Sequence, residues 1–339
     1  MFPLKLGVVG PGIMWRDPHK VTLQAMPDEF QITAFSARSA PSREAFRADF
    51  PKARFFEHYE ELARSPEVDA LVVTTPIPLN GPVTLAGLRA GKHVFVEKPF
   101  ATSTAQACEI MEAEKNSRGR VFILENLLYT PRWDEVKTLL DGRRLGDFAM
   151  FDRVSHGFMD MANDPYGFAN TAWRVDSGFP LGPLFDGGIH EVALMQQLFG
   201  RPQSVYATGQ NWRPEHGEYD LINMLFGYRG GQTGCWSFSS LLGGRQNHFV
   251  IRCTEGLIVF DYYRCTLQWR DGREETLEFA PDAGAFFKGL NPAMWKKFAD
   301  CLRTGEAPPY TPRESVWDVA TLEAVERSIK TKTRVDICV

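Results

Sequence analysis

The sequence LGVVGPGIMW, residues 6–15, carries the strongest indication of the fold. The apolar, β-branched run Leu4–Val9 predicts a strand, and the Gly-Pro-Gly at 10–12 ends it and turns the chain toward a helix. Glycines at such a turn let the backbone approach a pyrophosphate, whose charge is favoured by the following helix N-terminus. Trp15 stands at the third glycine position of G-x-G-x-x-G, so the motif alone is weak. The first helix is therefore expected to pack less closely, or to start later, near Pro18.

Strands and helices alternate through the first third of the chain. Ser103 is a suitable N-cap for one helix, and another is expected to start at Pro82 and to end before Gly91. Alternation with short connections favours a parallel sheet covered on both faces. Further strands are predicted at Gln31–Phe35, Ala70–Val73, His93–Val96 and Val121–Leu124, and a helix at Tyr59–Arg64.

The pattern of residue types changes after about residue 145, where runs of aromatic and β-branched residues follow one another, separated by turn residues. Such runs predict a meandering antiparallel sheet, interrupted by a helix at Asp186–Phe199 and closed by helices at Pro292–Arg303 and Arg313–Lys330. The predicted strands are Phe148–Val154, Tyr219–Tyr228, Gln232–Ser240, Asn247–Cys253, Leu257–Asp261, Thr266–Arg270 and Glu274–Phe279.

The predicted fold class is α/β: an N-terminal Rossmann domain with a parallel sheet, and a C-terminal α+β domain with a large, mostly antiparallel sheet. We place the nucleotide-binding domain at residues 1–125 and the substrate and oligomerisation domain at residues 126–339. Two domains agree with a length of 339 residues, at roughly 100–200 residues per domain.

Composition excludes several classes of function. The chain has 38 Lys and Arg against 42 Asp and Glu, a formal net charge of −4. A mildly acidic chain without a basic block is a poor candidate for binding nucleic acid or an anionic membrane. No apolar run approaches the roughly 20 residues of a membrane span. The N-terminus, MFPLKLGVVG, leads straight into a strand pattern, so no signal peptide is expected.

The six cysteines lack the spacing of a metal site. No two of them form C-x-x-C, and none stands near a histidine at zinc-finger spacing. We therefore expect buried thiols in a reducing cytoplasm, and no bound metal.

The end of the second strand, ITAFSARS at 32–39, bears on the choice of cofactor. A site for NAD favours a carboxylate here, which binds both ribose hydroxyls. This chain offers Ser36, Ala37, Arg38 and Ser39 instead, and a guanidinium flanked by hydroxyls suits a 2′-phosphate. We expect NADP ahead of NAD, although Arg38 as a solvated loop residue remains the alternative.

The stretch HVFVEKPF, residues 93–100, places charge at the end of a buried strand. Ligands bind at the carboxyl ends of strands in open α/β sheets. A lysine in such a partly dry place can donate a hydrogen bond to a reacting oxygen. Glu97 and Lys98 are therefore candidate site residues, and Pro99 is expected to fix the turn, with a cis bond as one form. The alternative for Lys98 is an ordinary solvated lysine.

The stretch GPLFDGGIHEV, residues 182–192, supplies a candidate proton carrier. Asp186 and His190 are four residues apart, so on a helix they share a face. His190 can accept and return a proton near neutral pH, and Asp186 can hold a substrate or orient the imidazole. A structural hydrogen bond is the alternative, and a metal site lacks a third ligand.

Weaker candidates complete the site. Asn126 and Tyr129 follow the fifth strand and could line a cleft; ordinary loop polarity is the alternative. Trp173 and Arg174 could present a flat face and a guanidinium to a polyol or an acid; a surface cation–aromatic pair is the alternative. Aromatic residues of the second half are more often core than a stacking platform.

Taken together, these residues resemble the Gfo/Idh/MocA oxidoreductase family, which includes glucose–fructose oxidoreductase and inositol dehydrogenase. The resemblance covers nearly the whole chain. It is strongest in EELARSPEVDALVVTTP (60–76) and LAGLRAGKHVFVEKPFA (85–101), and it resumes at WRVDSG (173–178), LFDGGIH (184–190) and SIKTKTRVDI (328–337).

The resemblance implies NAD(P)-linked oxidation or reduction at a carbinol or carbonyl carbon, usually of a sugar, polyol or related small molecule. It implies a second domain that often mediates oligomerisation, and hence a homodimer or homotetramer. In this sequence Lys98 matches the family's catalytic lysine, His190 its proton-transfer histidine and Asp186 its substrate-binding aspartate. Thr75-Pro76 matches the loop beside the cofactor.

Three positions depart from the family pattern. Trp15 replaces a small residue of the glycine motif, and Asn80 stands where a histidine often follows the Thr-Pro loop. Ala37 stands where NAD-using members often carry aspartate. The expected cofactor contacts are Gly10, Gly12, Ile13, Ser36, Arg38, Thr75, Pro76, Glu97 and Lys98, and the expected substrate contacts are Lys98, Asn126, Tyr129, Trp173, Arg174, Asp186 and His190.

Two functions from different classes follow. In the first, the protein is an NAD(P)-dependent oxidoreductase in which His190 takes the hydroxyl proton and Lys98 stabilises the charge on the same oxygen; the two roles could be exchanged. In the second, it is a regulatory protein that senses nucleotide or sugar without turnover, since fold alone does not establish chemistry. The joint presence of Lys98, Asp186 and His190 favours the first.

Overall fold

The computed structural model describes residues 2–157, 171, 181–212, 218–240, 242, 244–260, 264–279 and 290–339. The chain forms two compact units. The first comprises Met1–Tyr129 and Ala285–Val319, and the second comprises Thr130–Gly284 and Ala320–Val339. The units differ from a division at residue 125 because the segment from Ala285 to Val319 groups with the N-terminal part of the chain. The domain bounds drawn from the sequence remain a prediction.

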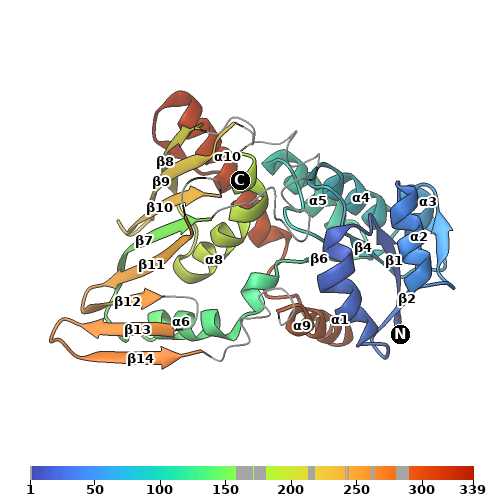
Figure 1. Ribbon diagram of the computed structural model, residues 1–339, viewed down its shortest axis with the longest axis horizontal. Helices are drawn as coiled ribbons and strands as arrows, with labels where there is room; N and C mark the ends of the chain where they lie inside the picture. Colours follow the sequence, from blue (N-terminus) through green and yellow to red (C-terminus); the bar gives the residue numbers. More distant parts are fainter. Residues whose placement is uncertain are drawn as a thin grey trace. The chain divides into compact units, whose positions relative to one another are not determined.

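The first unit contains a six-stranded sheet in the order β3-β2-β1-β4-β5-β6, with every pair parallel (Figure 1). This confirms the predicted parallel sheet, and the strand order is that of a dinucleotide-binding fold. The short edge strand β3 was not predicted. The strands are β1 (Leu4–Val9), β2 (Phe30–Ser36), β3 (Arg54–Phe56), β4 (Ala70–Val73), β5 (His93–Val96) and β6 (Val121–Ile123).

Helices accompany this sheet as the strand–helix alternation predicts, although α2 was not predicted and the bounds of α4 differ. The helix expected to start at Pro82 starts at Ile77, because the first turn needs no N–H from Pro78. The Thr84 hydroxyl then donates to the Asn80 carbonyl at 2.8 Å. Ser103 caps its helix by accepting from the Gln106 amide, as predicted. The helices are α1 (Lys20–Gln24), α2 (Ala40–Asp49), α3 (Tyr59–Arg64), α4 (Ile77–Arg89), α5 (Thr104–Lys115) and the 3₁₀ turn η2 (Asn126–Tyr129).

A helix from late in the sequence, α9 (Leu290–Thr304), completes the core of the first unit. It contacts α1 and η2, and its Trp295 ring lies 4.8 Å from the Phe95 ring and 5.2 Å from the Phe30 ring. Trp295 and Phe298 are fully buried. Burial of aromatic rings of this size is worth several kcal/mol each. The core beneath the nucleotide-type sheet therefore depends on residues some 200 positions downstream.

The second unit contains a nine-stranded sheet in the order β14-β13-β12-β11-β7-β10-β9-β8-β15 (Figure 1). Two antiparallel meanders flank β7, whose pairing with β10 is parallel. The sheet is thus mostly antiparallel, as predicted, with one parallel pair inside it. Its strands are β7 (Phe148–His156), β8 (Ser204–Gln210), β9 (Leu221–Gly227), β10 (Thr233–Ser239), β11 (Gln246–Cys253), β12 (Gly256–Phe260), β13 (Arg264–Trp269), β14 (Glu274–Glu278) and β15 (Val335–Asp336).

Helices α6 (Pro131–Asp141) and α8 (Ile189–Phe199) pack on this sheet. Trp133 of α6 stacks on Phe260 at 4.4 Å, and Phe199 of α8 stacks on Phe151 at 4.8 Å. The last helix, α10 (Pro312–Thr331), contains the point at which the units divide. None of the helices in the described part of the chain has both the length and the apolar character needed to cross a bilayer.

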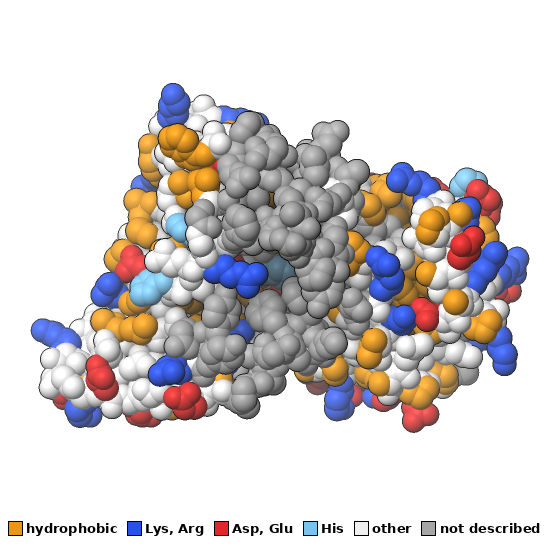
Figure 2. Space-filling model, in the orientation of Figure 1, with side chains coloured by type: hydrophobic (Ala, Val, Ile, Leu, Met, Phe, Trp, Pro, Cys, Tyr) orange, Lys and Arg blue, Asp and Glu red, His pale blue; other side chains and the backbone are white. Residues whose placement is uncertain are grey.

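The face of the sheet formed by alternate residues of β7–β10 holds a shallow hollow of about 310 Å³. Hydrophobic side chains are visible over this part of the second unit (Figure 2). Tyr206 and Leu225 on this face are 42% and 48% exposed. The residues of the same strands with the opposite orientation, such as Trp236, are buried.

Candidate functional site

The turn after β1 requires glycine for two separate reasons. Gly10 has φ +71°, and a Cβ there would lie 2.6 Å from Thr75 Cγ2 and 3.0 Å from Thr75 Cα. Its N–H donates to the Ser36 carbonyl at 3.0 Å. The ends of β1 and β4 therefore touch where the strand order reverses, which is the place where open α/β sheets bind nucleotides. The bare backbone at Gly10 and Gly12 fits the pyrophosphate of a dinucleotide.

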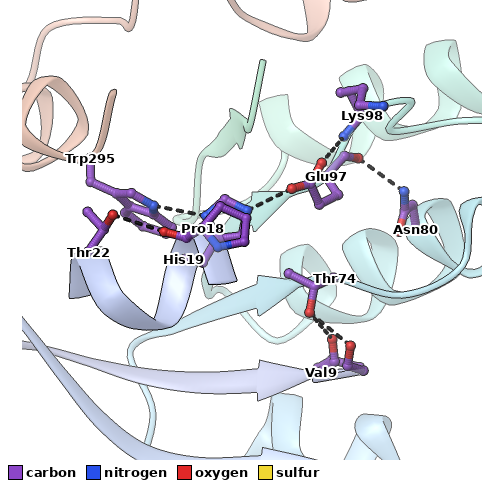
Figure 3. Close-up of polar contacts among 10 residues, drawn as sticks. Val9, Pro18, His19, Thr22, Thr74, Asn80, Glu97, Lys98 and Trp295 are labelled. Atoms are coloured by element: carbon purple, nitrogen blue, oxygen red, sulfur yellow. Dashed lines mark hydrogen bonds and ion pairs between the residues drawn. The ribbon is translucent and has the colours of Figure 1, made fainter. Parts of the chain in front are cut away.

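Two threonines fix the loop that faces this turn. The Thr74 hydroxyl donates to the Gly10 carbonyl at 2.9 Å and approaches the Val9 carbonyl at 3.4 Å (Figure 3). The Thr75 hydroxyl donates to Asn80 Oδ1 at 2.8 Å. Pro76 precedes the first residue of α4. The Thr75-Pro76 loop predicted beside the cofactor is therefore held against the glycine turn.

Trp15 does not delay the helix that follows this turn. Helical structure begins at Ile13 and widens into a π-helical turn, η1 (Trp15–His19). The Lys20 N–H donates to the Trp15 carbonyl, five residues back, and Pro18 sits within the turn. The expected start near Pro18 is wrong because the wider turn accommodates a proline and a large indole. The Trp15 ring is 1% exposed and packs against Phe46 of α2 at 5.5 Å.

The end of β2 carries no carboxylate. Ala37 is buried and Arg38 is exposed. Ser39 caps α2 by accepting from the Ser42 amide, and the Arg43 guanidinium donates to the Arg38 carbonyl at 3.2 Å. A second arginine therefore lies beside Arg38, which sequence reasoning missed although a helical turn from the cap places it there. Ser36 is buried, and its hydroxyl approaches the Glu57 carbonyl at 3.4 Å.

The turn after β5 holds Lys98. The Lys98–Pro99 bond is cis, as the sequence allowed. The Asn80 amide donates to the carbonyls of Glu97 and Pro99 at 3.1 and 2.8 Å. Asn80 is fully buried. The departure from the family pattern at this position therefore has a structural role: one amide side chain joins the Thr75 loop to the Lys98 turn.

The Glu97 carboxylate points into the protein. Its Oε1 lies 2.7 Å from His19 Nε2, and its Oε2 accepts from the Lys98 amide at 3.2 Å. His19 Nδ1 in turn accepts from Trp295 Nε1 at 3.1 Å. Figure 3 shows Trp295, His19 and Glu97 in a row that ends at Lys98. Sequence reasoning missed His19 and Trp295 because 276 positions separate them.

Asn126 and Tyr129 lie on η2, just beyond β6. Asn126 is 8% exposed. The Tyr129 ring packs edge-on against Phe298 at 5.7 Å, and burial raises the pKa of its hydroxyl well above the usual range. Both side chains belong to the first unit. Their predicted contact with substrate stays a prediction.

The second unit carries the other half of the predicted site. Asp186 lies in a π-helical turn, η3 (Leu184–Gly188), which leads into α8, where His190 is the second residue. Both side chains are partly exposed. A Cβ at Gly187 would meet nothing within 4 Å, whereas one at Gly188 would clash with Leu184 and approach Trp236. The backbone at Gly187 is therefore open beside Asp186, and Gly188 serves packing. π-Turns occur frequently at functional sites.

A buried ion pair anchors the helix that carries His190. Arg153 of β7 donates to both carboxylate oxygens of Glu191, at 2.9 and 2.6 Å, and is only 6% exposed. Bidentate ion pairs of this kind fix the geometry of the two side chains as well as pairing their charges. The spacing in the sequence gives no signal for it.

The structure thus brings Gly10, Gly12, Thr75, Glu97 and Lys98 together within the first unit, and it places Asp186 and His190 four residues apart in the second. Trp173 and Arg174 lie outside the described residues. Within the described ranges, no group of three or more His, Cys, Asp or Glu is arranged to hold a metal ion.

Comparison with known proteins gives a consistent result. Residues 4–125 match the GFO_IDH_MocA model, an oxidoreductase family with an NAD-binding Rossmann fold, and residues 133–259 match the GFO/IDH/MocA C-terminal domain. Bovine trans-1,2-dihydrobenzene-1,2-diol dehydrogenase is 31% identical, with 96% of this chain and 97% of that protein covered. The scyllo-inositol 2-dehydrogenase (NADP(+)) IolW of Bacillus subtilis is 26% identical, with 97% and 94% covered. The crystal structure of an oxidoreductase from Thermotoga maritima superimposes with a TM-score of 0.88 at 28% identity, covering 98% of both chains.

Proposed function

Since the chain belongs to the Gfo/Idh/MocA oxidoreductase family and is an NAD(P)-dependent oxidoreductase, we propose that it acts on a carbinol or carbonyl carbon of a sugar, polyol or related small molecule. The observation that carries this proposal is the contact between Gly10 and Thr75 at the strand crossover, with Lys98 at the end of the next strand. We propose that this arrangement forms a nucleotide cradle with the Lys98 ammonium beside it.

The proposed substrate class is a polyol with neighbouring hydroxyls. Two relatives are named for scyllo-inositol and for a trans-1,2-diol. Each of these compounds has hydroxyls on adjacent carbons. A site with Lys98, His190 and Asp186 has donors and acceptors enough to hold two such oxygens.

The proposed mechanism assigns a separate task to each polar group. A bound nicotinamide nucleotide supplies the acceptor or donor of hydride. In the oxidising direction His190 takes the proton of the reacting hydroxyl, and Lys98 donates a hydrogen bond to the same oxygen as negative charge develops on it. Asp186 accepts a hydrogen bond from the adjacent hydroxyl and helps to orient the imidazole. In the alternative assignment Lys98 carries the proton and His190 supplies the hydrogen bond.

The proposed cofactor is NADP, ahead of NAD. Arg38 is exposed at the end of β2, with Ser39 and Arg43 beside it, and these are groups that bind a 2′-phosphate. A relative named for NADP(+) is consistent with this. Gly10, Gly12, Ile13, Ser36, Thr75, Pro76 and Glu97 are proposed to line the rest of the cofactor site.

The remaining substrate contacts are proposed from both units. Asn126 and Tyr129 follow β6 in the first unit, and Trp173 and Arg174 belong to the stretch that resembles the family in the second. Polar and flat side chains of this kind suit a hydroxylated ring.

We propose that the protein works as a homodimer or homotetramer in the cytoplasm. The exposed apolar side chains Tyr206 and Leu225 on the open sheet face suit a second copy of this chain, since a two-fold contact uses the same patch on both partners. All six cysteines are free thiols, which is consistent with a reducing compartment, although only Cys265 and Cys301 are buried as expected. Binding of nucleic acid or of a membrane is not part of the proposal.

The test is reduction of NADP⁺ or NAD⁺ in the presence of a panel of inositols, sugars and diols, followed at the absorbance band of the reduced nicotinamide. The proposal expects turnover with at least one vicinal diol. Tight nucleotide binding without turnover on the whole panel would instead support a sensor on the same fold.

A further inference from the structure

We propose that His19 and Trp295 are positioning residues, which hold the Glu97–Lys98 turn through a buried chain of hydrogen bonds. The proposal rests on the proposed function in one respect, namely that Lys98 touches the reacting oxygen. It adds that a helix from late in the sequence, α9, sets the place of that lysine. Neither residue touches the substrate or the cofactor in this account.

The three side chains linked by these hydrogen bonds are all buried. Trp295 is fully buried, His19 is 1% exposed and Glu97 is 5% exposed. A buried carboxylate is costly unless donors satisfy its oxygens. Here the His19 ring and the Lys98 amide supply one donor to each oxygen, at 2.7 and 3.2 Å. Removal of His19 therefore leaves a buried oxygen without this donor.

The indole of Trp295 fixes which atom donates and which accepts in each hydrogen bond of the row. Trp295 Nε1 can only donate, so His19 Nδ1 must accept, and the ring proton must lie on Nε2. That proton points at Glu97 Oε1. One tautomer of His19 thus satisfies both neighbours, and every donor in the row from Trp295 to Glu97 has an acceptor.

Both ends of this row of hydrogen-bonded residues are held by further contacts. The Trp295 ring packs against the rings of Phe30 and Phe95, with centroid distances of 5.2 and 4.8 Å. On the other side of the turn, Asn80 donates to the carbonyls of Glu97 and Pro99. The backbone on both sides of Lys98 is therefore held, through the Glu97 side chain and through the carbonyls of Glu97 and Pro99. A catalytic group that loses about 1 Å of its placement can lose about 10²-fold in rate.

Three variants separate positioning from packing. His19→Gln keeps a side-chain N–H near the position of Nε2 and can still donate to Glu97, whereas His19→Asn is one methylene shorter and cannot. Trp295→Phe keeps a buried aromatic ring but removes the donor to His19 together with part of the indole volume. Trp133→Phe is the matched control, because this buried indole stacks on Phe260 while its Nε1 finds no acceptor among the described residues.

The kinetic expectation is a fall in kcat with little change in the KM for the nucleotide. His19→Asn should lose about 10-fold or more in kcat and Trp295→Phe somewhat less, whereas His19→Gln should recover most of the wild-type rate. Trp133→Phe should leave kcat unchanged. A kcat for His19→Asn within twofold of wild type, or no recovery in His19→Gln, would overturn the proposal.

Hydrogen exchange of the unliganded protein gives a second readout that needs no turnover. Amides in a peptide covering residues 94–102 should exchange up to about tenfold faster in His19→Asn and Trp295→Phe, since a hydrogen bond of ordinary strength is lost. They should return toward wild type in His19→Gln and stay unchanged in Trp133→Phe. Equal exchange in wild type and both disruptive variants would contradict the proposal even if the wild type turned over no alcohol. Failure of the proposed function shows itself differently, as an inactive wild type or a fully active Lys98→Met.

Discussion

Gly10 and Thr75 meet at van der Waals contact across the point where the strand order of the first sheet reverses. A Cβ on Gly10 would lie 2.6 Å from Thr75 Cγ2, closer than real Cβ atoms approach a neighbour. The positive φ of Gly10 adds a second requirement for glycine. The proposed nucleotide cradle is therefore shaped by the backbone of one strand end against the side chain of Thr75 at the end of another.

Gly10→Ala should lower the free energy of unfolding by about 1–3 kcal/mol and weaken nucleotide binding by at least about tenfold. Gly91→Ala is the control, because Gly91 has the same φ of +71° but open space around its missing Cβ. That variant should cost only about 1–2 kcal/mol and leave nucleotide binding intact. Urea unfolding and nucleotide titration measure both effects. Equal nucleotide affinity in the two variants would argue against the cradle.

Lys98→Met and His190→Asn should each reduce turnover by about 10²–10⁴-fold, because each removes a group proposed to act on the reacting oxygen. The dissociation constant for the nucleotide should stay within a few fold of the wild-type value. Steady-state kinetics and nucleotide titration are the measurements. Near wild-type turnover in both variants would refute the assignment of these two residues.

Arg38→Ala should weaken NADPH binding by about 10–100-fold, because a charge-assisted contact to the 2′-phosphate is lost, and should change NADH binding little. Arg47→Ala is a suitable control, since it removes an arginine of the same helix region that lies over the Phe55 ring. Fluorescence titration with both nucleotides decides the point. If the wild type binds NADH at least as tightly as NADPH, the interpretation of Arg38 is wrong.

The stability of the first unit should fall as the pH drops below the ordinary histidine value of 6.5. Burial, followed by the charge of Arg120, lowers the pKa of His93, whose Nδ1 accepts from the Arg120 amide at 3.2 Å. The unfolded chain therefore binds a proton more readily than the folded one, and stability present above pH 6.5 is lost as the pH falls toward the depressed pKa. His93→Asn, which retains an acceptor, should flatten this dependence in urea unfolding between pH 7 and 5. An identical slope in both proteins would contradict it.

Leu225→Asp should convert an oligomer to a monomer, because it places a charge at the centre of the exposed face of β8–β10. Light scattering at several concentrations measures the mass. An oligomer of unchanged mass would exclude this face as the contact between copies.

The sequence alone was sufficient to predict the elements whose residues form a clear local pattern. The bounds of β1, β4 and β5 agree with prediction to the residue, because each is a continuous apolar run between turn residues. It was insufficient for β3, a three-residue edge strand, and for α2, a mostly exposed helix that buries only Phe46. The two π-turns, at Trp15–His19 and Leu184–Gly188, were not predicted either.

Some residues of the candidate site could likewise be predicted from the sequence, and others could not. Gly10 and Lys98 follow from a turn and a strand end that can be located in the sequence alone, and Asp186 follows from its four-residue spacing to His190. His19 and Trp295 do not, because their partners come from distant parts of the chain and nothing in the local pattern indicates them. Asn80 was noted only as a departure, and its bonds to Thr75 and Pro99 became visible in three dimensions.

The most direct test of hydride transfer is a single turnover with an inositol or vicinal diol deuterated at its carbinol carbons, followed by mass spectrometry of the nucleotide. The reduced nucleotide formed by the wild type should gain one deuterium, and its formation should slow by about 10²–10⁴-fold in Lys98→Met. A reduced nucleotide without deuterium, or one formed equally fast by Lys98→Met, would contradict the proposed mechanism.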